Sequence, residues 1–406
     1  MLVRHADPVA AKDGEKVRVA AFDMDHTLIA PKSGKVFPVD GNDWRWWSNK
    51  VCRRLQELAD EGFVLVIFSN QSGLGDTYSR PNKGKRPKLA DGAVAGKTAT
   101  ETVHVDKAAT VAGKVDKILA ELQRPAHVVL STGKRLFRKP SLMLWQYAVD
   151  ELLGVDDGAI DREQSFFVGD GAGRPAKWRP GAKKDFSCSD RQFAYNARLP
   201  FFTPEEYFNK QAAVQFSWHG LDVSRLEETL RAQTITEGGI GKLTREDGKP
   251  EVIVMHGYPG SGKSTISTKY LVPRGYVRVN QDTLKTRDKC ERAVRDALAK
   301  KLPVVVDNTN ANEAVRAAYI RLAKAANVPI RAFVMTADHD LAMHLNMYRE
   351  RLSLCEQVHV PTMVYHQFKK NRVLPSVDEG FDEVREINFV PSLSTERERA
   401  LFYQFG

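Results

Sequence analysis

The sequence predicts an α/β protein with two domains, each built on a doubly wound parallel sheet. Two series of short apolar runs, rich in β-branched residues, alternate with segments of helical spacing. Continuous apolar strands that alternate with helices are typical of parallel sheets covered on both faces. The chain has 406 residues, which is long for a single hydrophobic core and favours two or three domains.

Eight apolar runs form the predicted strands, four in each half of the chain. The first four occupy residues 17–22, 63–68, 126–130 and 165–169. The second four occupy residues 251–257, 276–279, 302–306 and 330–335. Segments with helical spacing lie between the strands, as at 47–62 and 312–327.

A polar, Gly-rich stretch without apolar periodicity separates the two series and is the best linker candidate. We predict a disordered lead-in at 1–15, a first domain at 16–233, a linker at 234–249 and a second domain at 250–406. Residues 76–110 lack a core pattern and form a predicted insertion in the first domain. Its basic cluster, PNKGKRPK, is typical of a solvated loop, with a nucleic-acid contact or a nuclear-import signal as alternatives.

The composition is that of a basic globular protein, with a net charge of +10 and a pI near 9.3. Such an excess favours a polyanionic partner, although many basic proteins bind none. Four cysteines give no disulfide framework, which favours a reducing compartment. No stretch has the length of an apolar membrane span, and the N-terminus lacks the apolar core of a signal peptide. We therefore expect an intracellular protein without membrane contact.

Polar side chains follow the predicted strands of the first domain, at the edge where parallel sheets collect their chemistry. They are Asp23 and Asp25 after the first strand, Ser69 and Asn70 after the second, Asp170 after the fourth, and Lys139 before a proline. A carboxylate can attack phosphorus to form an aspartyl-phosphate, and a second carboxylate can protonate the leaving group and then activate water. Because carboxylates repel phosphate, such a site needs Mg²⁺ and a lysine. The set predicts a centre for phosphate transfer.

These residues resemble the motifs of haloacid-dehalogenase-like phosphatases, since DMDHT, SNQ, RKP and VGD follow one another in the order of that family. The resemblance implies that Asp23 is the nucleophile and a Mg²⁺ ligand. It implies that Asp25 is the general acid/base and gives its carbonyl oxygen to Mg²⁺, while Asp170 is a further Mg²⁺ ligand. It also implies that Ser69 and Lys139 bind the phosphate.

Two features depart from that family. His26 stands where Gly is common, and we interpret it as a tolerated turn residue. The residues GAGRP, directly after VGD, lack the second acid that many members carry, and Asp185 or Asp190 could compensate. Thr27 and Asn70 are further candidates for substrate contacts.

The stretch GYPGSGKST follows a predicted strand and precedes a helical segment, which is the setting of a phosphate-binding P-loop. Its glycines let backbone N–H groups wrap phosphate oxygens, and the helix N-terminus adds a favourable dipole. The predicted nucleotide-binding residues are Gly257, Gly260, Gly262, Lys263, Ser264 and Thr265. Because Lys263 would contact the β- and γ-phosphates and Ser264 would bind Mg²⁺, we expect an ATP site.

Further residues complete the predicted kinase site. Asp282 follows a predicted strand and is a candidate general base for an acceptor hydroxyl. Asp307 follows the next strand, where it could support the Mg²⁺ shell or the P-loop. Arg349, on a predicted helix, could close over the triphosphate as a lid. The alternative, a solvated helical face, weighs more for Arg351 than for Arg349.

A kinase and a phosphatase in one chain make sense if they act on different positions of one substrate. Broken nucleic-acid strands often carry 3′-phosphate and 5′-hydroxyl ends, whereas ligation needs the reverse, and the basic charge fits such a polyanion. From about residue 16 onward the chain resembles the eukaryotic polynucleotide 5′-kinase/3′-phosphatase family, through stretches such as GRPAKWRPGAKKDFSCSDRQFA and VVDNTN. A forkhead-associated domain is not expected, and Met347 stands where relatives tend to have Arg.

We hypothesise a bifunctional DNA-end-processing repair enzyme that uses Mg²⁺ and ATP on nicks, gaps and breaks. It is expected to act as a monomer in the nucleus, with the mitochondrion as the alternative compartment and RNA ends as the alternative substrate. A small-molecule phosphatase fused to a metabolite kinase is the alternative enzyme class, and a scaffold with degenerate sites is the non-catalytic alternative. The aromatic stretch DWRWW at 43–47 could stack on bases or, equally, pack a helix start.

Overall fold

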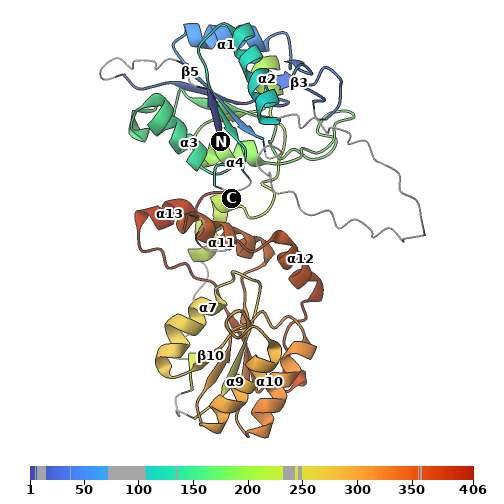
Figure 1. The fold of residues 1–406 in the computed structure, drawn as a ribbon, viewed down its shortest axis with the longest axis vertical. Helices are drawn as coiled ribbons and strands as arrows, with labels where there is room; N and C mark the ends of the chain where they lie inside the picture. Colours follow the sequence, from blue (N-terminus) through green and yellow to red (C-terminus); the bar gives the residue numbers. More distant parts are fainter. Residues whose placement is uncertain are drawn as a thin grey trace, which may run out of the picture. The chain divides into compact units, whose positions relative to one another are not determined.

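The computed structural model describes residues 1–4, 6, 15–36, 38–71, 107–133, 136–231, 243–245, 249–354, 356 and 359–406. The chain forms two compact units, Met1–His219 and Gly220–Gly406, each of the predicted α/β class (Figure 1). Of the predicted insertion at 76–110, only residues 107–110 are described, and most of the predicted linker at 234–249 lies outside the described residues.

The first unit contains a six-stranded sheet in the order β1-β6-β5-β2-β7-β8. Its strands are β1 (Leu2–Arg4), β2 (Val19–Asp23), β5 (Val64–Asn70), β6 (His127–Ser131), β7 (Phe166–Val168) and β8 (Phe201–Phe202). Neighbouring strands are parallel except β1, which runs antiparallel to β6. A separate ribbon pairs β3 (Ile29–Ala30) with β4 (Arg45–Trp46).

Strand β1 lies within the stretch predicted as a disordered lead-in. Leu2 and Val3 pack against the two core clusters on opposite faces of the sheet. Arg4 forms an ion pair with Asp116 at 2.7 Å. Three residues are too few to show a strand pattern in the sequence, so only the partner strand reveals this edge strand.

Helices cover both faces of the first sheet (Figure 1). One face carries α1 (Val51–Asp60), α2 (Lys107–Leu122) and α5 (Pro204–Asn209), and the other carries α3 (Met143–Tyr147), its π-helical continuation Ala148–Leu153, and α4 (Ser189–Asn196). Because side chains alternate along a strand, Phe22 of β2 faces α1 whereas Ala21 belongs to the core on the other face. Coverage of both faces explains why the strands are apolar throughout.

The aromatic stretch at 43–47 packs into the first unit. Trp44 is buried, and Trp46 and Trp47 pack against the core beneath α1. Trp46 Nε1 also donates to Glu121 Oε1 at 2.6 Å. These contacts favour the packing interpretation over a free stacking platform.

The second unit contains a parallel sheet in the order β10-β11-β9-β12-β13. Its strands are β9 (Val252–His256), β10 (Val277–Val279), β11 (Val304–Val306), β12 (Ile330–Met335) and β13 (Glu383–Ile387). The first four match the predicted strands. Strand β13 escaped prediction because three of the five residues of its sequence, EVREI, are charged, as suits an edge strand.

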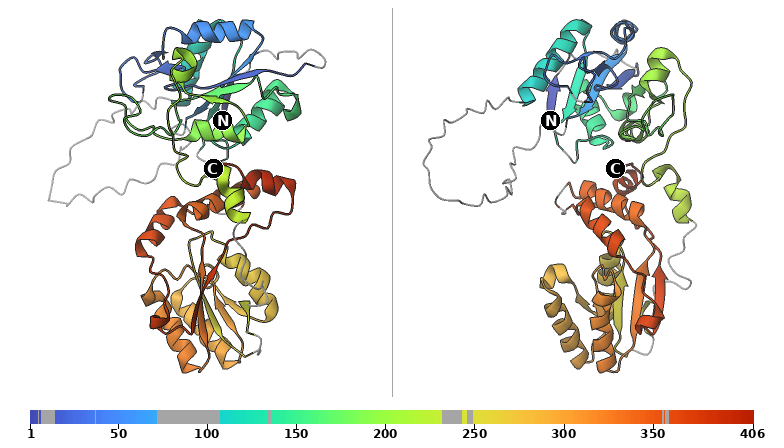
Figure 2. Two further views of the ribbon diagram at one scale, coloured as in Figure 1. Left: turned by 180° about the vertical axis from the view of Figure 1, so that it is seen from behind. Right: turned by 90° about the vertical axis from the view of Figure 1, so that its right-hand side faces the viewer.

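Helices also pack on both faces of the second sheet (Figure 2). The helices of this unit are α6 (Leu226–Arg231), α7 (Lys263–Ile266), α8 (Gln281–Leu284), α9 (Arg287–Ala299), α10 (Glu313–Ala325), α11 (His339–Leu352), α12 (Thr362–Asn371) and α13 (Glu396–Phe402). Helices α9 and α10 cover one face, and the segment that begins with α7 covers the other. In the described part of both units, every helix is too short or too polar to cross a membrane.

Candidate active sites

Three carboxylates meet at the carboxyl edge of the first sheet. Asp23 is the last residue of β2, Asp170 lies two residues beyond β7, and Asp190 lies in the first turn of α4. One oxygen of each lies within 4.8 Å of the others. The topology brings them together because β2 and β7 are adjacent parallel strands.

Lys139 lies inside this acidic cluster. Its buried ammonium group forms an ion pair with Asp23, lies 2.8 Å from Asp190 Oδ1 and donates to the carbonyl oxygen of Phe68 at 3.0 Å. Asn70 holds the backbone of Lys139, because its Oδ1 accepts from Lys139 N at 2.9 Å and its Nδ2 donates to Lys139 O at 3.2 Å. The amide of Asn70, a predicted substrate contact, is therefore engaged in placing Lys139.

Burial and mutual repulsion determine the charge of the cluster. Burial raises the pKa of Asp23 to about 7, opposed by Lys139 and reinforced by Asp190. Burial, followed by the charge of Asp23, raises the pKa of Asp170 well above its usual value. Burial disfavours charged Lys139, but the carboxylates of Asp190 and Asp23 outweigh it and raise the lysine pKa. Three carboxylates thus share one cation, and hard oxygen ligands at this spacing fit the predicted Mg²⁺.

Asp25 lies beside this cluster and is held by three side chains. Its Oδ1 lies 3.1 Å from Nζ of Lys114, a buried residue of α2. Its Oδ2 accepts hydrogen bonds from Gln71 Nε2 and from Ser69 Oγ, the latter at 3.4 Å. Lys114 was missed because no motif marks it, whereas Gln71 belongs to the SNQ motif but was not singled out.

The structure distinguishes between Asp185 and Asp190, the two candidates for a second acid of the site. Asp190 joins Asp23 and Asp170, and its Oδ2 accepts from Gly171 N at 2.8 Å. Asp185 instead pairs with Arg174, at 2.8 Å. Of the two candidates left open by the sequence, Asp190 is the one placed to bind a metal.

Thr27 and His26 belong to the turn after β2. Thr27 Oγ1 accepts from the Asp170 N–H at 3.0 Å, so it orients the backbone of a predicted metal ligand. His26 has a φ of 61°, a conformation that favours glycine, and its Nε2 lies 3.0 Å from the carbonyl oxygen of Val36. The positive φ and this contact fit the interpretation of His26 as a turn residue.

The P-loop connects β9 to α7. Gly260 and Gly262 have φ values of 80° and 96°, which require glycine for an unstrained loop, and Gly262 caps α7. A Cβ on Gly257 would lie 2.8 Å from a neighbouring side-chain carbon. Ser264 and Thr265 are exposed in the first turn of the helix. The loop therefore leaves backbone N–H groups and two hydroxyls accessible to a phosphate chain.

Lys263 is buried in the P-loop. Its Nζ donates to the carbonyl oxygens of Gly257 and Tyr258, at 3.0 and 2.6 Å. Burial lowers the pKa of Lys263 to about 8, against the attraction of Asp307 and Asp282. Asp282 is exposed in α8, directly beyond β10, so an acceptor hydroxyl can reach it.

Asp307 directly follows β11 and is buried. Its Oδ2 accepts from Arg278 Nε at 2.7 Å, and the Arg278 guanidinium reaches Ser264 Oγ at 3.5 Å. Its Oδ1 is buried without a hydrogen-bond partner among the described residues. An orphaned carboxylate oxygen near the P-loop serine fits a Mg²⁺ shell. Arg278 was missed because it lies inside a strand and carries no motif.

Of the two arginines of α11, only Arg349 lies at the P-loop. A Cβ on Gly260 would lie 3.5 Å from its guanidinium. Its Nε is buried without a hydrogen-bond partner within the described part of the chain. Arg351 instead donates to the carbonyl oxygen of Phe405 at 2.8 Å. Arg349 is thus the arginine placed to meet a triphosphate.

A cavity of about 230 Å³ lies beside the P-loop. Its largely apolar wall includes Ile266, Tyr270, Met335, Tyr348, Phe389 and Pro391. Gly262 and Arg349 line it as well, so the cavity adjoins the place of the phosphates. The segment after β13 was not predicted as part of the site because β13 itself was missed.

The two sites define a phosphotransfer protein in which a haloacid-dehalogenase-like phosphatase unit precedes a P-loop kinase unit. A family model described as "Polynucleotide kinase 3 phosphatase" matches residues 18–208, and one described as "AAA domain" matches residues 252–293 and 286–375.

Curated relatives agree with this division. The "Bifunctional polynucleotide phosphatase/kinase" of Schizosaccharomyces pombe is 32% identical over 369 residues, which are 91% of this chain and 79% of the relative. The "Polynucleotide 3'-phosphatase" of Saccharomyces cerevisiae is 29% identical over 223 residues, which are 48% of this chain and 90% of the relative. The chain belongs to the bifunctional polynucleotide phosphatase/kinase family.

Proposed function

We propose that this protein prepares broken DNA strands for ligation, by removing 3′-phosphates in the first unit and phosphorylating 5′-hydroxyls in the second. The observation that carries the proposal is the presence, in one chain of this family, of the Asp23–Lys139–Asp190 cluster and a complete P-loop. RNA ends are the alternative substrate.

In the proposed phosphatase reaction, Lys139 holds Oδ1 of Asp23 and leaves Oδ2 to attack phosphorus. The bond to the 3′-oxygen breaks, and that oxygen takes a proton from Asp25. Water then gives a proton to Asp25 and attacks phosphorus, which releases inorganic phosphate and regenerates Asp23. Mg²⁺ held by Asp23, Asp170 and Asp190 would neutralise the phosphate oxygens.

In the proposed kinase reaction, Asp282 takes the proton of the 5′-hydroxyl. The hydroxyl oxygen attacks the γ-phosphorus of ATP, and the bond to ADP breaks. Lys263 and Arg349 stabilise the negative charge of the transferred phosphoryl group, while Ser264 and Asp307 would hold Mg²⁺. The apolar cavity that includes Phe389 is the proposed adenine pocket, because it adjoins the P-loop.

A loop in the first unit carries an exposed aromatic residue that favours a polynucleotide as the substrate. Phe186 is 98% exposed. The loop is nevertheless held firmly, because Arg174 N donates to Asp185 Oδ2 at 2.9 Å and Asp185 N donates to Arg174 O at 3.0 Å. Lys184, two residues before Phe186, is also exposed. A fixed, exposed aromatic ring with a neighbouring cation suits stacking on an unpaired base.

The test uses a nicked duplex with 3′-phosphate and 5′-hydroxyl ends, compared with sugar phosphates and nucleotides. We expect loss of the 3′-phosphate with Mg²⁺ alone, gain of a 5′-phosphate only with added ATP, and KM values for the duplex that rise steeply with salt. Equal kcat/KM for sugar phosphates, with no salt dependence, would instead support the small-molecule enzyme. An otherwise identical nick with ribonucleotide ends compares the RNA alternative directly.

A further inference from the structure

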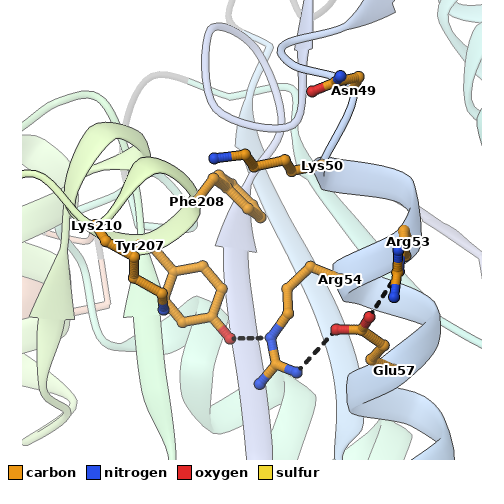
Figure 3. A pocket seen from close by; sticks show the side chains of 8 residues that line it. All are labelled: Asn49, Lys50, Arg53, Arg54, Glu57, Tyr207, Phe208 and Lys210. Atoms are coloured by element: carbon orange, nitrogen blue, oxygen red, sulfur yellow. Dashed lines mark hydrogen bonds and ion pairs between the residues drawn. The ribbon is translucent and has the colours of Figure 1, made fainter.

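A cavity of about 380 Å³ lies on the first unit, between α1 and the end of α5 (Figure 3). Four cationic residues and one carboxylate, Glu57, line it. The cations are Lys50, Arg53 and Arg54 from the start of α1, and Lys210 from the residue that follows α5. The cavity therefore has a marked excess of positive charge, unlike the apolar cavity beside the P-loop.

Arg54 is held rigidly within this basic cavity. Its Nε donates to the hydroxyl oxygen of Tyr207 at 3.3 Å, and its Nη1 lies 3.3 Å from Glu57 (Figure 3). The same Nη1 lies 2.8 Å from Glu61. The neighbouring ring of Phe208 is buried in the core beneath α1. A guanidinium fixed from two sides loses little entropy when it binds a further acceptor.

Within the described part of the chain, the two lysines of the basic cavity have no anionic partner. Lys50 and Lys210 are exposed and come from different elements on either side of the cavity (Figure 3). Among the described residues, neither ammonium group makes a hydrogen bond or an ion pair, and Lys210 only lies over the ring of Tyr207, at 5.2 Å. The positive charges of two uncompensated cations that line one cavity repel each other, and a bound anion reduces that repulsion.

The basic cavity is separate from the phosphatase centre but lies toward the same edge of the sheet, where the parallel strands end. None of its cations contacts Asp23, Asp170 or Asp190. Helix α1 leads through a short turn into the start of β5, so its first turn lies toward the carboxyl ends of the strands. Asp23 lies at this edge, at the end of β2. A nucleic-acid strand whose 3′ end reaches Asp23 can therefore continue along the protein surface toward α1.

We propose that the basic cavity binds a backbone phosphate of the polynucleotide substrate, upstream of the three nucleotides that end in the 3′-phosphate removed at Asp23. The proposal rests on the proposed phosphatase function. Cations of this kind contact phosphate oxygens without regard to base sequence, so the cavity would add affinity and orientation for long strands. Lys50 and Lys210 are the residues whose charge an incoming phosphate compensates.

The test compares Lys50→Ala/Lys210→Ala with the unchanged protein on two 3′-phosphorylated substrates, a trinucleotide and a strand of about twenty nucleotides. For the long strand at low salt, KM should rise about tenfold with kcat unchanged, and the slope of log KM against log salt should fall by about one to two. For the trinucleotide, kcat and KM should stay unchanged. The control of equal charge is Lys300→Ala/Lys324→Ala. It removes two exposed lysines of the second unit, at the amino-terminal edge of its sheet and away from the P-loop.

Three results would overturn the proposal. One is an unchanged KM and salt slope for the long strand, and another is an equal loss for both substrates, which would place the lysines in the catalytic centre. The third is an unchanged long-strand KM together with lost binding of an acidic phosphopeptide, which would assign the cavity to a protein partner. Absence of trinucleotide turnover by the unchanged protein would instead refute the proposed phosphatase function.

Discussion

Replacing Lys139 with methionine isolates the electrostatic role of the one cation in the acidic cluster. Methionine has a similar length and volume, so the change removes the charge while leaving little empty space. In the structure the ammonium group pairs with Asp23 and Asp190, and Lys139 as a whole is 3% exposed. Its loss leaves three carboxylates within 4.8 Å of one another without the counter-charge that Lys139 supplies.

The expected cost follows from this burial. Breaking a buried ion pair by removing one partner costs about 3–5 kcal/mol, a large share of the roughly 5–15 kcal/mol that stabilises a typical domain. The cost should shrink toward pH 5. The carboxyls of Asp23 and Asp170 have raised pKa values in the folded state, so the folded state binds protons that the unfolded chain releases. Lowering the pH therefore stabilises the folded variant relative to the unfolded one.

All six tryptophans lie between residues 44 and 218, so their fluorescence reports unfolding of the first unit alone. Urea unfolding in the presence of a chelator, at pH 7.5 and pH 5, measures the free energy of unfolding for Lys139→Met. Lys183→Met, at an exposed position, is the control and should change stability by less than about 0.5 kcal/mol. If Lys139→Met is as stable as the control at pH 7.5, the described cluster is not the electrostatic unit that we infer.

Three further predictions address other contacts. Lys114→Ala should release Asp25 and lower the phosphatase kcat about tenfold, which is ~1.4 kcal/mol of activation free energy. Lys117→Ala, on the same helix, should leave kcat unchanged, and equal kcat values for the two variants would contradict the prediction. Phe389→Ala should raise the kinase KM for ATP several-fold and leave phosphatase kcat/KM unchanged, and an unchanged KM would remove the adenine assignment. Burial lowers the pKa of His344 to about 4, so its stability contribution is complete above pH 6.5 and is lost as the pH falls toward 4. His344→Gln should thus flatten the pH dependence of unfolding of Gly220–Gly406 between pH 7.5 and 5, monitored by circular dichroism, and an unaltered slope would refute it.

The sequence predicted the parts of both sites that follow apolar strands. Asp23 and Lys263 stand next to patterns that identify a strand and its end, so local reasoning reaches them. Lys114 could not be predicted because it approaches Asp25 from a helix 89 residues away. Asp190 was one of two equivalent candidates, and only the packing of α4 against the glycines after β7 distinguishes it from Asp185.

The strands of the two large sheets that escaped prediction, β1, β8 and β13, lie at sheet edges. Strands β1 and β13 have three and five residues, and neither has the continuous apolar character of a central strand. Edge strands are only half covered, so their sequences carry a weak signal. The segment after β13 forms a wall of the apolar cavity, which is why that part of the kinase site was also missed.

The most direct test of two independent sites uses Asp23→Asn and Lys263→Ala on one nicked duplex with 3′-phosphate and 5′-hydroxyl ends, in Mg²⁺ and ATP. We predict that Asp23→Asn converts only the 5′ end, that Lys263→Ala converts only the 3′ end, and that the mixture converts both. Loss of both conversions in either single variant, with its fold intact by circular dichroism, would contradict the assignment of two sites.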